Sequence, residues 1–217
     1  MYEYGGVKIR WLGHDGFIIQ NEKKVCIDPY EIETSEKVDI LLLTHEHFDH
    51  CSVSDIKKVC DENTLIFAIP ACKGELSKVK ARQINYVKPN DKFKVGEINI
   101  EAVPAYNVNK FRAPNQPFHP KKDGKVGYIL TIKGVRIYHM GDTDFIDEMK
   151  NLQVDIALVP VSGTYVMTSK EAIEATNMIK PKVAIPMHYG SIVGSEKDAL
   201  DFKKEAKCEV VILKKEN

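Results

Sequence analysis

The chain has 217 residues, of which 43% are hydrophobic and 29% are charged, and its 31 basic side chains balance 31 acidic ones. This composition predicts one globular domain over 1–217 with a sizeable core, and it excludes a disordered or collagen-like chain. Zero net charge provides no positive field to attract nucleic acid, which disfavours a general nucleic-acid binder.

The first half of the chain predicts a β-meander followed by alternating strands and helices. Alternating runs rich in Ile and Phe indicate strands, and a nearly continuous apolar run indicates a strand buried on both faces. The expected elements are strands over 8–20 and 24–28, a buried strand over 38–44, a helix from Ser54 to about Cys60, a strand over 65–69 and a helix over 72–79. The buried strand runs directly into a histidine-rich loop.

The second half repeats this order, with hairpins first and strand–helix units later. Turn residues separate strands between 86 and 105, and a long loop over 107–124 contains three prolines. The remaining expected elements are a hairpin of strands 126–133 and 135–139, a strand over 155–159, a helix over 169–179 capped by Ser169, a strand over 183–186, a helix over 196–206 and a last strand over 209–213. Two such halves predict two sheets face to face with helices outside.

Three histidines and one aspartate lie within six residues of the loop after the buried strand. In an extended segment, side chains two apart point the same way, so His45 and His47 can bind one ion together. Asp49 and His50 then point to a second place. Imidazole and carboxylate donors suit zinc, and also manganese, iron or nickel, better than calcium or magnesium. A surface turn whose histidines cap neighbouring groups is the alternative, and it explains one histidine better than three.

Two further candidate ligands stand at the ends of predicted strands. Asp142 follows the strand 135–139, and His188 follows the strand 183–186. Alone, an aspartate after a glycine is usually a turn residue, and a single histidine is usually a structural group. Together with the histidine loop, they indicate that several strand ends converge on one metal site.

These residues resemble the metallo-β-lactamase superfamily of metal-dependent hydrolases. The resemblance rests on Thr44-His45-Glu46-His47-Phe48-Asp49-His50, Met140-Gly141-Asp142-Thr143-Asp144 and Pro186-Met187-His188-Tyr189. The opening Trp11-Leu12-Gly13-His14-Asp15-Gly16-Phe17 is similar to a cytoplasmic branch that includes ascorbate-6-phosphate lactonase. The resemblance spans nearly the whole chain and implies an α/β fold, a four-layer αββα sandwich with the metals between the sheet edges.

The resemblance also implies which side chains bind one or two zinc ions. It assigns His45 and His47 to a first ion, Asp49, His50 and His188 to a second, and Asp142 to a bridge between both.

One expected ligand of the first ion is absent. The superfamily places a third histidine after a strand in the middle of the chain, where this sequence has Tyr106 and Asn107. Neither is a usual zinc ligand. Three alternatives stay open: the first site is weak or empty, His119 enters it from the long loop, or Asn107 supplies an oxygen.

The expected chemistry is hydrolysis by a metal-bound hydroxide, because a divalent ion lowers the pKa of its water towards about 7. Asp49 or Asp142 is expected to orient this water and carry its proton. His14 either donates a proton to the leaving group or contacts substrate, or it only hydrogen-bonds the sheet edge. His139 is expected to support a ligand or, again, only the sheet edge.

The resemblance implies a small ester or lactone as the substrate, and the locally basic loop 107–124 favours an anionic one. A solvated charged loop is the alternative account of those basic side chains. Cleavage of a phosphodiester in RNA or a nucleotide is a second function, and a metal-holding protein without turnover is a third.

The sequence also bears on location and assembly. Its longest apolar run, Ile40–Leu43, is far shorter than the ~20 residues that span a bilayer, so no membrane segment is expected. The first residues lack the basic start and apolar stretch of a signal peptide, which predicts a cytoplasmic protein. A homo-oligomer is compatible with the sequence.

Overall fold

The computed structural model describes residues 1–216, which form two compact units. The N-terminal unit comprises Met1–Lys88 and the C-terminal stretch from Leu213, and the C-terminal unit comprises Pro89–Ile212. Each unit contains one seven-stranded sheet. The single domain over 1–217 stays a prediction.

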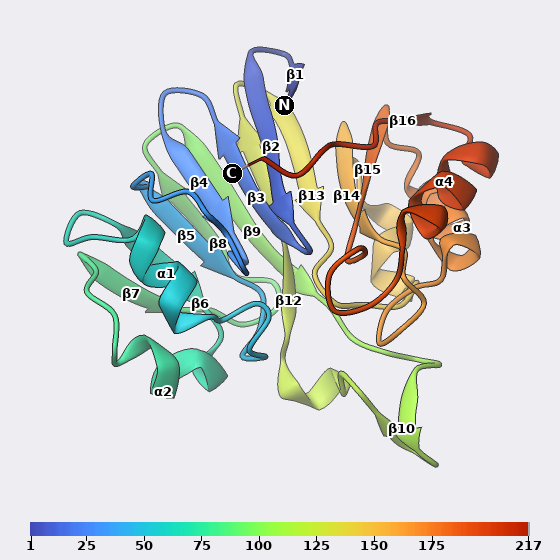
Figure 1. The fold of residues 1–217 in the computed structure, drawn as a ribbon, viewed down its shortest axis with the longest axis horizontal. Coiled ribbons are helices and arrows are strands. Elements are labelled where there is room, and N and C mark those ends of the chain that lie inside the picture. Colours follow the sequence, from blue (N-terminus) through green and yellow to red (C-terminus); the bar gives the residue numbers. More distant parts are fainter. Residues whose placement is uncertain (217) are drawn as a thin grey trace. The chain divides into compact units, whose positions relative to one another are not determined.

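The N-terminal unit is a mixed sheet with the strand order β1-β2-β3-β4-β5-β6-β7 (Figure 1). Its strands are β1 (Tyr2–Tyr4), β2 (Val7–Gly13), β3 (Gly16–Gln20), β4 (Lys24–Ile27), β5 (Ile40–Leu43), β6 (Leu65–Ala68) and β7 (Gln83–Tyr86). Strands β1 to β4 pair antiparallel, and β4 to β7 pair parallel. All four residues of β5 are buried, as expected of a central strand in a parallel arrangement.

The helices of this unit differ in detail from the prediction. Helix α1 (Val53–Val59) begins one residue earlier than predicted, because Ser52 is its N-cap and accepts the Asp55 N–H. The helix predicted over 72–79 is shorter, consisting of a 3₁₀ turn η1 (Pro70–Cys72) followed by α2 (Lys73–Leu76).

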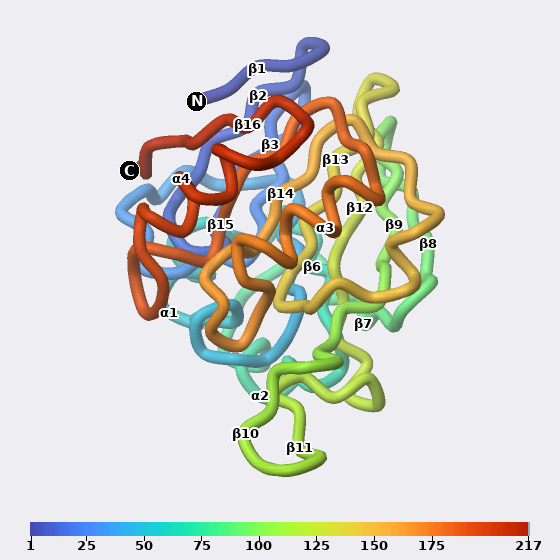
Figure 2. Tube along the Cα trace, turned by 90° about the vertical axis from the view of Figure 1, so that its right-hand side faces the viewer, coloured from blue at the N-terminus to red at the C-terminus, as the bar shows by residue number. Residues whose placement is uncertain are grey.

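The C-terminal unit is a second mixed sheet with the order β16-β15-β14-β13-β12-β9-β8. Its strands are β8 (Lys92–Val95), β9 (Ile98–Pro104), β12 (Val126–Ile132), β13 (Val135–His139), β14 (Ile156–Pro160), β15 (Val183–Met187) and β16 (Glu209–Val210). Its helices are η2 (Lys121–Asp123), η3 (Asp147–Asn151), α3 (Ser169–Ile179) and α4 (Glu196–Glu205), and α3 and α4 pack against each other (Figure 2). The last strand is shorter than predicted.

Two other expectations in this unit are corrected. The segment 107–124 is not a plain loop, because β10 (Phe111–Ala113) and β11 (Gln116–Pro117) pair in it as a small hairpin. The N-cap of α3 is Thr168 rather than Ser169, since Thr168 and Glu171 form a capping box.

The topology of the C-terminal sheet brings two candidate ligands to one edge. Strands β13, β14 and β15 are parallel neighbours, so their carboxyl ends meet at the same edge. Asp142 follows β13, and His188 follows β15 directly. Within residues 1–216, no helix has both the length and the apolar character needed to cross a membrane.

Candidate metal centre

Asp28 organises the histidine loop of the N-terminal unit from the end of β4. It is fully buried, and its carboxylate accepts the Thr44 N–H at 2.9 Å, the Thr44 hydroxyl at 2.5 Å and His50 Nδ1 at 2.9 Å. Because the Thr44 hydroxyl gives its one proton to Asp28, its oxygen accepts the Nδ1–H of His45 at 2.9 Å. Both histidines are therefore oriented with the lone pair on Nε2, as metal ligands require.

The structure places His45 and His47 side by side. His45 Nε2 lies 3.0 Å from His47 Nδ1, and the ring centroids are 4.6 Å apart. His45 is buried, whereas the side chain of His47 is 37% exposed. The two nitrogens are close enough to bind one ion, with His47 on the solvent side.

Asp49 and His50 form a second cluster in the same unit, together with His14. Asp49 Oδ2 lies 3.1 Å from His14 Nε2 and 3.6 Å from His50 Nε2. These three residues offer ligand atoms that all lie within 4.8 Å of one another. Asp15, which the sequence analysis did not single out, is fully buried with Oδ2 3.6 Å from His50 Nε2. His14 is thus directed at a carboxylate and not only at the sheet edge.

In the C-terminal unit, two histidines face the carboxylate of Asp142. His119 Nε2 lies 3.3 Å from its Oδ2, and His188 Nε2 lies 3.4 Å from its Oδ1. All three side chains are buried. Each oxygen of Asp142 therefore faces a different imidazole.

Asn107 orients His119. Its Nδ2 donates to the Tyr165 carbonyl at 2.8 Å, and because a carbonyl only accepts, Oδ1 is the atom that faces His119. This Oδ1 accepts both the backbone N–H and Nδ1–H of His119 at 2.9 Å. His119 consequently directs the lone pair of Nε2 at Asp142. Among the alternatives for the absent histidine, this geometry favours His119 as ligand with Asn107 as its support.

Tyr106 is engaged elsewhere. Its hydroxyl donates to Glu148 at 2.8 Å and accepts from Lys121 at 3.2 Å. Burial and the Glu148 carboxylate raise the pKa of Tyr106, so its hydroxyl stays protonated at neutral pH. This side chain therefore braces the loop rather than binding metal.

Ser162 orients His188. The Ser162 hydroxyl donates to the Thr164 carbonyl at 3.3 Å, so its oxygen accepts from His188 Nδ1 at 2.9 Å. The proton of His188 is therefore on Nδ1, and the lone pair of Nε2 faces Asp142.

His139 supports the turn that carries Asp142. It is fully buried, and its Nδ1 accepts the N–H of Gly141, which has φ +63°. On the neighbouring strand, a Cβ at Gly127 would lie 2.6 Å from the His139 carbonyl oxygen, so only glycine fits there. His139 thus acts on the backbone and not as a ligand, since its accepting nitrogen is already used.

The donor spacing within each unit fits metal ions. Atoms bound at 2.0–2.1 Å to a tetrahedral zinc ion lie about 3.3 Å apart. The separations are 3.0 Å between His45 and His47, 3.3 Å between His119 and Asp142, and 3.4 Å between His188 and Asp142. Two acceptors that face each other at such distances are stabilised by a cation between them. The residues present therefore fit divalent metal.

The basic side chains of the segment 107–124 are largely neutralised by acidic partners. Lys110 Nζ lies 2.8 Å from Glu171, and Lys121 Nζ lies 2.7 Å from Glu148. Arg112 is exposed, and its guanidinium lies 5.5 Å from the centroid of the Phe118 ring. Arg112 also donates to the Phe118 carbonyl at 3.2 Å, and Lys122 is a second exposed basic side chain of this segment.

Three residues beside the candidate ligands were not predicted to contact them: Asp28, Asp15 and Ser162. Asp28 carries a local signal, because it directly follows the buried strand β4. Asp15 belongs to the opening motif beside His14, but it and Ser162 each contact a histidine that lies far away in sequence, so no local pattern predicts those contacts.

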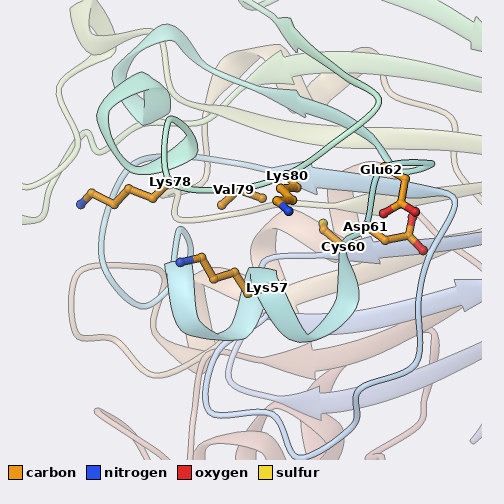
Figure 3. A pocket seen from close by; sticks show the side chains of 7 residues that line it. All are labelled: Lys57, Cys60, Asp61, Glu62, Lys78, Val79 and Lys80. Carbon is orange, nitrogen blue, oxygen red and sulfur yellow. The ribbon is translucent and has the colours of Figure 1, made fainter.

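Figure 3 shows a surface pocket of about 390 Å³ in the N-terminal unit, between the end of α1 and the segment after α2. It is lined by Lys57, Cys60, Asp61, Glu62, Lys78, Val79 and Lys80, and so by none of the candidate ligands. Burial raises the pKa of the Cys60 thiol to about 12, which makes it a poor nucleophile at neutral pH. The hydrolytic chemistry does not belong to this pocket.

Comparisons with known proteins show the family. The profile of the beta-lactamase superfamily domain matches residues 8–188, which include every candidate ligand. A UPF0173 metal-dependent hydrolase from Archaeoglobus fulgidus is 34% identical, with 96% of each chain covered. The chain belongs to the metallo-β-lactamase superfamily of metal-dependent hydrolases. Another UPF0173 metal-dependent hydrolase, from Pyrococcus furiosus, is 33% identical over 96% of each chain.

Solved structures agree with this assignment. The crystal structure of a proposed metal-dependent hydrolase from Parabacteroides distasonis has a TM-score of 0.81 and 34% identity, covering 96% of this chain and 94% of that one. The metallo hydrolase Igni18 from Ignicoccus hospitalis shares the fold, with a TM-score of 0.77 at 22% identity over 97% and 96% of the two chains. The predicted αββα fold class is confirmed, and the protein is a metal-dependent hydrolase.

Proposed function

We propose that this hydrolase cleaves a small anionic ester or lactone, like the branch that includes ascorbate-6-phosphate lactonase. The observation that carries the proposal is the carboxylate of Asp142, because each of its oxygens faces the Nε2 of a different histidine. Two-metal hydrolases use a shared ligand of this kind to hold two ions close together.

We assign the metal ligands from both units, with zinc as the metal and manganese, iron or nickel as alternatives. His45, His47 and His119 would hold a first ion, Asp49, His50 and His188 would hold a second, and Asp142 would be available to both. Buried carboxylates and imidazoles with fixed tautomers support this assignment.

Bound ions of this kind supply a water of lowered pKa and polarise the scissile carbonyl. Asp49 and Asp142 orient this water through their carboxylates. Because Asp49 Oδ2 lies 3.1 Å from His14 Nε2, a proton taken up by Asp49 can pass to His14. His14 then protonates the oxygen of the departing alcohol as the acyl C–O bond breaks.

The anionic group of the substrate has two suitable partners in the segment 107–124. Lys110 and Lys121 already pair with carboxylates, so the exposed side chains of Arg112 and Lys122 are left to contact it. A guanidinium binds a carboxylate or phosphate through two parallel hydrogen bonds, and this favours a substrate with such a group.

The reaction is tested by assaying the purified protein on lactones, aryl esters and bis-nitrophenyl phosphate, with its metal content measured alongside. We expect turnover of lactones or esters that chelation abolishes and zinc restores. Preference for the phosphodiester would replace the proposed substrate class, and bound metal without turnover of any ester or lactone would contradict it.

The ligand assignment is tested by metal stoichiometry. We expect His45→Ala and His119→Ala each to lose one of two ions, and His188→Ala to lose the other, because each removes one donor to the ion. Glu174→Gln, on the exposed face of α3, is the control and keeps both ions. A normal metal content in His119→Ala would contradict this assignment and mean that another group completes the first site.

We further propose a cytoplasmic protein that acts on small molecules without a nucleic-acid partner, alone or as a homo-oligomer. The balanced charge of the chain supports the absence of nucleic-acid binding.

A further inference from the structure

The turn between β14 and α3 has an unusual backbone. Gly163 has φ +73°, and Tyr165, a bulky residue, has φ +68°. Left-handed φ values are unfavourable for non-glycine residues and persist where surrounding contacts enforce them. Here the Gly163 N–H donates to the Met167 carbonyl at 2.9 Å, and Ser162 bridges to Thr168. The turn Ser162–Tyr165 is therefore closed and held in one shape.

The first contact of this turn is with His188. The Ser162 hydroxyl donates to the Thr164 carbonyl, and its oxygen accepts from His188 Nδ1. The carbonyl belongs to the same turn, so the turn itself decides which way the hydroxyl points. A Cβ at Gly194 would lie 2.6 Å from the Ser162 Cβ, which shows how tightly Ser162 is enclosed.

The second contact is with His119, through Asn107. The left-handed backbone at Tyr165 presents its carbonyl to Asn107 Nδ2 at 2.8 Å, and Asn107 Oδ1 holds His119 Nδ1 at 2.9 Å. The Tyr165 ring packs against Phe118 with centroids 4.6 Å apart, which fixes the residue preceding His119. One four-residue turn thus acts on the two histidines that face opposite oxygens of Asp142.

We propose that the turn Ser162–Tyr165 is a positioning element that sets the tautomers of His188 and His119 and so presents both Nε2 lone pairs to metal. This proposal rests on the proposed function, because it takes His188 and His119 as metal ligands. The tautomers themselves are properties of the protein without metal, so they are measured independently of any activity.

The first measurement is nitrogen-15 NMR of the metal-free protein at about pH 8.5, well above the ordinary histidine pKa of about 6.5. We expect His188 and His119 to carry their protons on Nδ1. In Ser162→Ala, we expect His188 to become a mixture of tautomers while His119 is unchanged, and Asn107→Ala should show the reverse pattern. Nε2–H tautomers in the parent, or unchanged tautomers in both variants, would overturn the proposal.

The second measurement is zinc affinity by chelator competition on the same proteins. We expect Ser162→Ala and Asn107→Ala each to weaken binding by about 10–100-fold, as loss of an orienting hydrogen bond does elsewhere. Thr164→Ala is the matched control, because it removes an exposed side chain from the same turn and keeps the carbonyl that Ser162 uses. A change of less than about twofold in Ser162→Ala, with the protein folded, contradicts the positioning role.

Failure of this inference is distinguishable from failure of the proposed function. If the tautomers are as expected but no ester or lactone is turned over, the turn positions ligands for another reaction. If turnover is found but the tautomers do not respond to Ser162→Ala or Asn107→Ala, the turn has no positioning role. Should Asn107→Ala not fold, Ser162→Ala alone decides, since Ser162 is only partly buried.

Discussion

At Asp28, one fully buried carboxylate accepts hydrogen bonds from the backbone and side chain of Thr44 and from His50. Through Thr44 it also fixes His45. A charged group that is buried and fully hydrogen-bonded in this way stabilises one arrangement of its neighbours, because any other leaves it without compensation. The orientation of two proposed ligands, His45 and His50, therefore depends on a residue outside the proposed ligand set.

Asp28→Asn tests this dependence. The amide replaces one acceptor oxygen with an NH₂ group that faces existing donors, so we expect about 2–3 kcal/mol less free energy of unfolding. Zinc affinity should fall by about 10–100-fold because His45 and His50 lose their orientation. Chemical denaturation and chelator competition measure the two effects.

Asp39→Asn is the comparison variant, because this carboxylate also accepts a strand N–H, that of Lys24, but its side chain is 43% exposed. It should lose little stability and no zinc affinity. Equal effects of the two substitutions would mean that Asp28 has no special role.

Among the elements, the segment 107–124 is fixed by side-chain contacts and not by pairing with the large sheet. The Asp144 carboxylate accepts the N–H groups of Val108 and Asn109, and Lys110 reaches Glu171 at the start of α3. These contacts anchor the segment that carries His119. An imidazole on such a segment can take the place of a ligand that other members place after a strand.

The pH dependence of this anchor follows from Glu171. Although burial acts to raise it, hydrogen bonds from Lys110, the Thr168 N–H and Asn109 lower the pKa of Glu171 from 4.5 to about 2. A carboxylate whose pKa is lower in the folded than in the unfolded state stabilises the fold at pH values above its unfolded-state pKa. This stabilisation is lost as the pH falls through the folded-state pKa. We expect the parent to have a larger free energy of unfolding than Glu171→Gln, with the largest difference at neutral pH. Denaturant titration without metal measures this difference.

This advantage should shrink between about pH 4.5 and 2 as Glu171 protonates in the folded state. Glu174→Gln, on the exposed side of the same helix, should show no such difference. An advantage that stays constant down to pH 2 would show that the Lys110 pair does not depend on the charge of Glu171.

For the whole molecule, the residues that we propose as ligands come from both units. The N-terminal unit contributes the histidine loop, and the C-terminal unit contributes Asp142, His119 and His188. Buried carboxylates and imidazoles are expensive to desolvate without a counter-charge, so metal should favour the folded chain over the unfolded one.

Thermal unfolding with and without zinc measures this linkage. At a free zinc concentration about 100 times its Kd, we expect about 2.7 kcal/mol of added stability and a corresponding rise in Tm. His188→Ala should lose most of this rise, whereas Thr164→Ala should keep it. A Tm independent of zinc in the parent would argue against metal binding by the folded state.

Most strands of the two large sheets and the histidine loop could be predicted, because they depend on local patterns. An apolar run such as 38–44 specifies a buried strand wherever it lies, and the spacing of His45, His47, Asp49 and His50 reports ligand chemistry directly. Helix ends were less well predicted. Ser54 and Ser169 lie close to the true N-caps, Ser52 and Thr168, and can form the same capping hydrogen bond, so only the backbone geometry decides which residue is the cap.

The sequence by itself determined the superfamily and the class of metal-dependent hydrolase, and it supplied most of the candidate ligands, since these are recorded in short motifs at strand ends. Only the tertiary structure decided which residue faces Asp142 beside His188, and what orients each imidazole. Those choices depend on hydrogen bonds between residues far apart in the chain, such as Asn107 with Tyr165 and Asp28 with His50. The orientation of a side chain by a residue far away in sequence produces no periodic or compositional pattern in the amino-acid sequence.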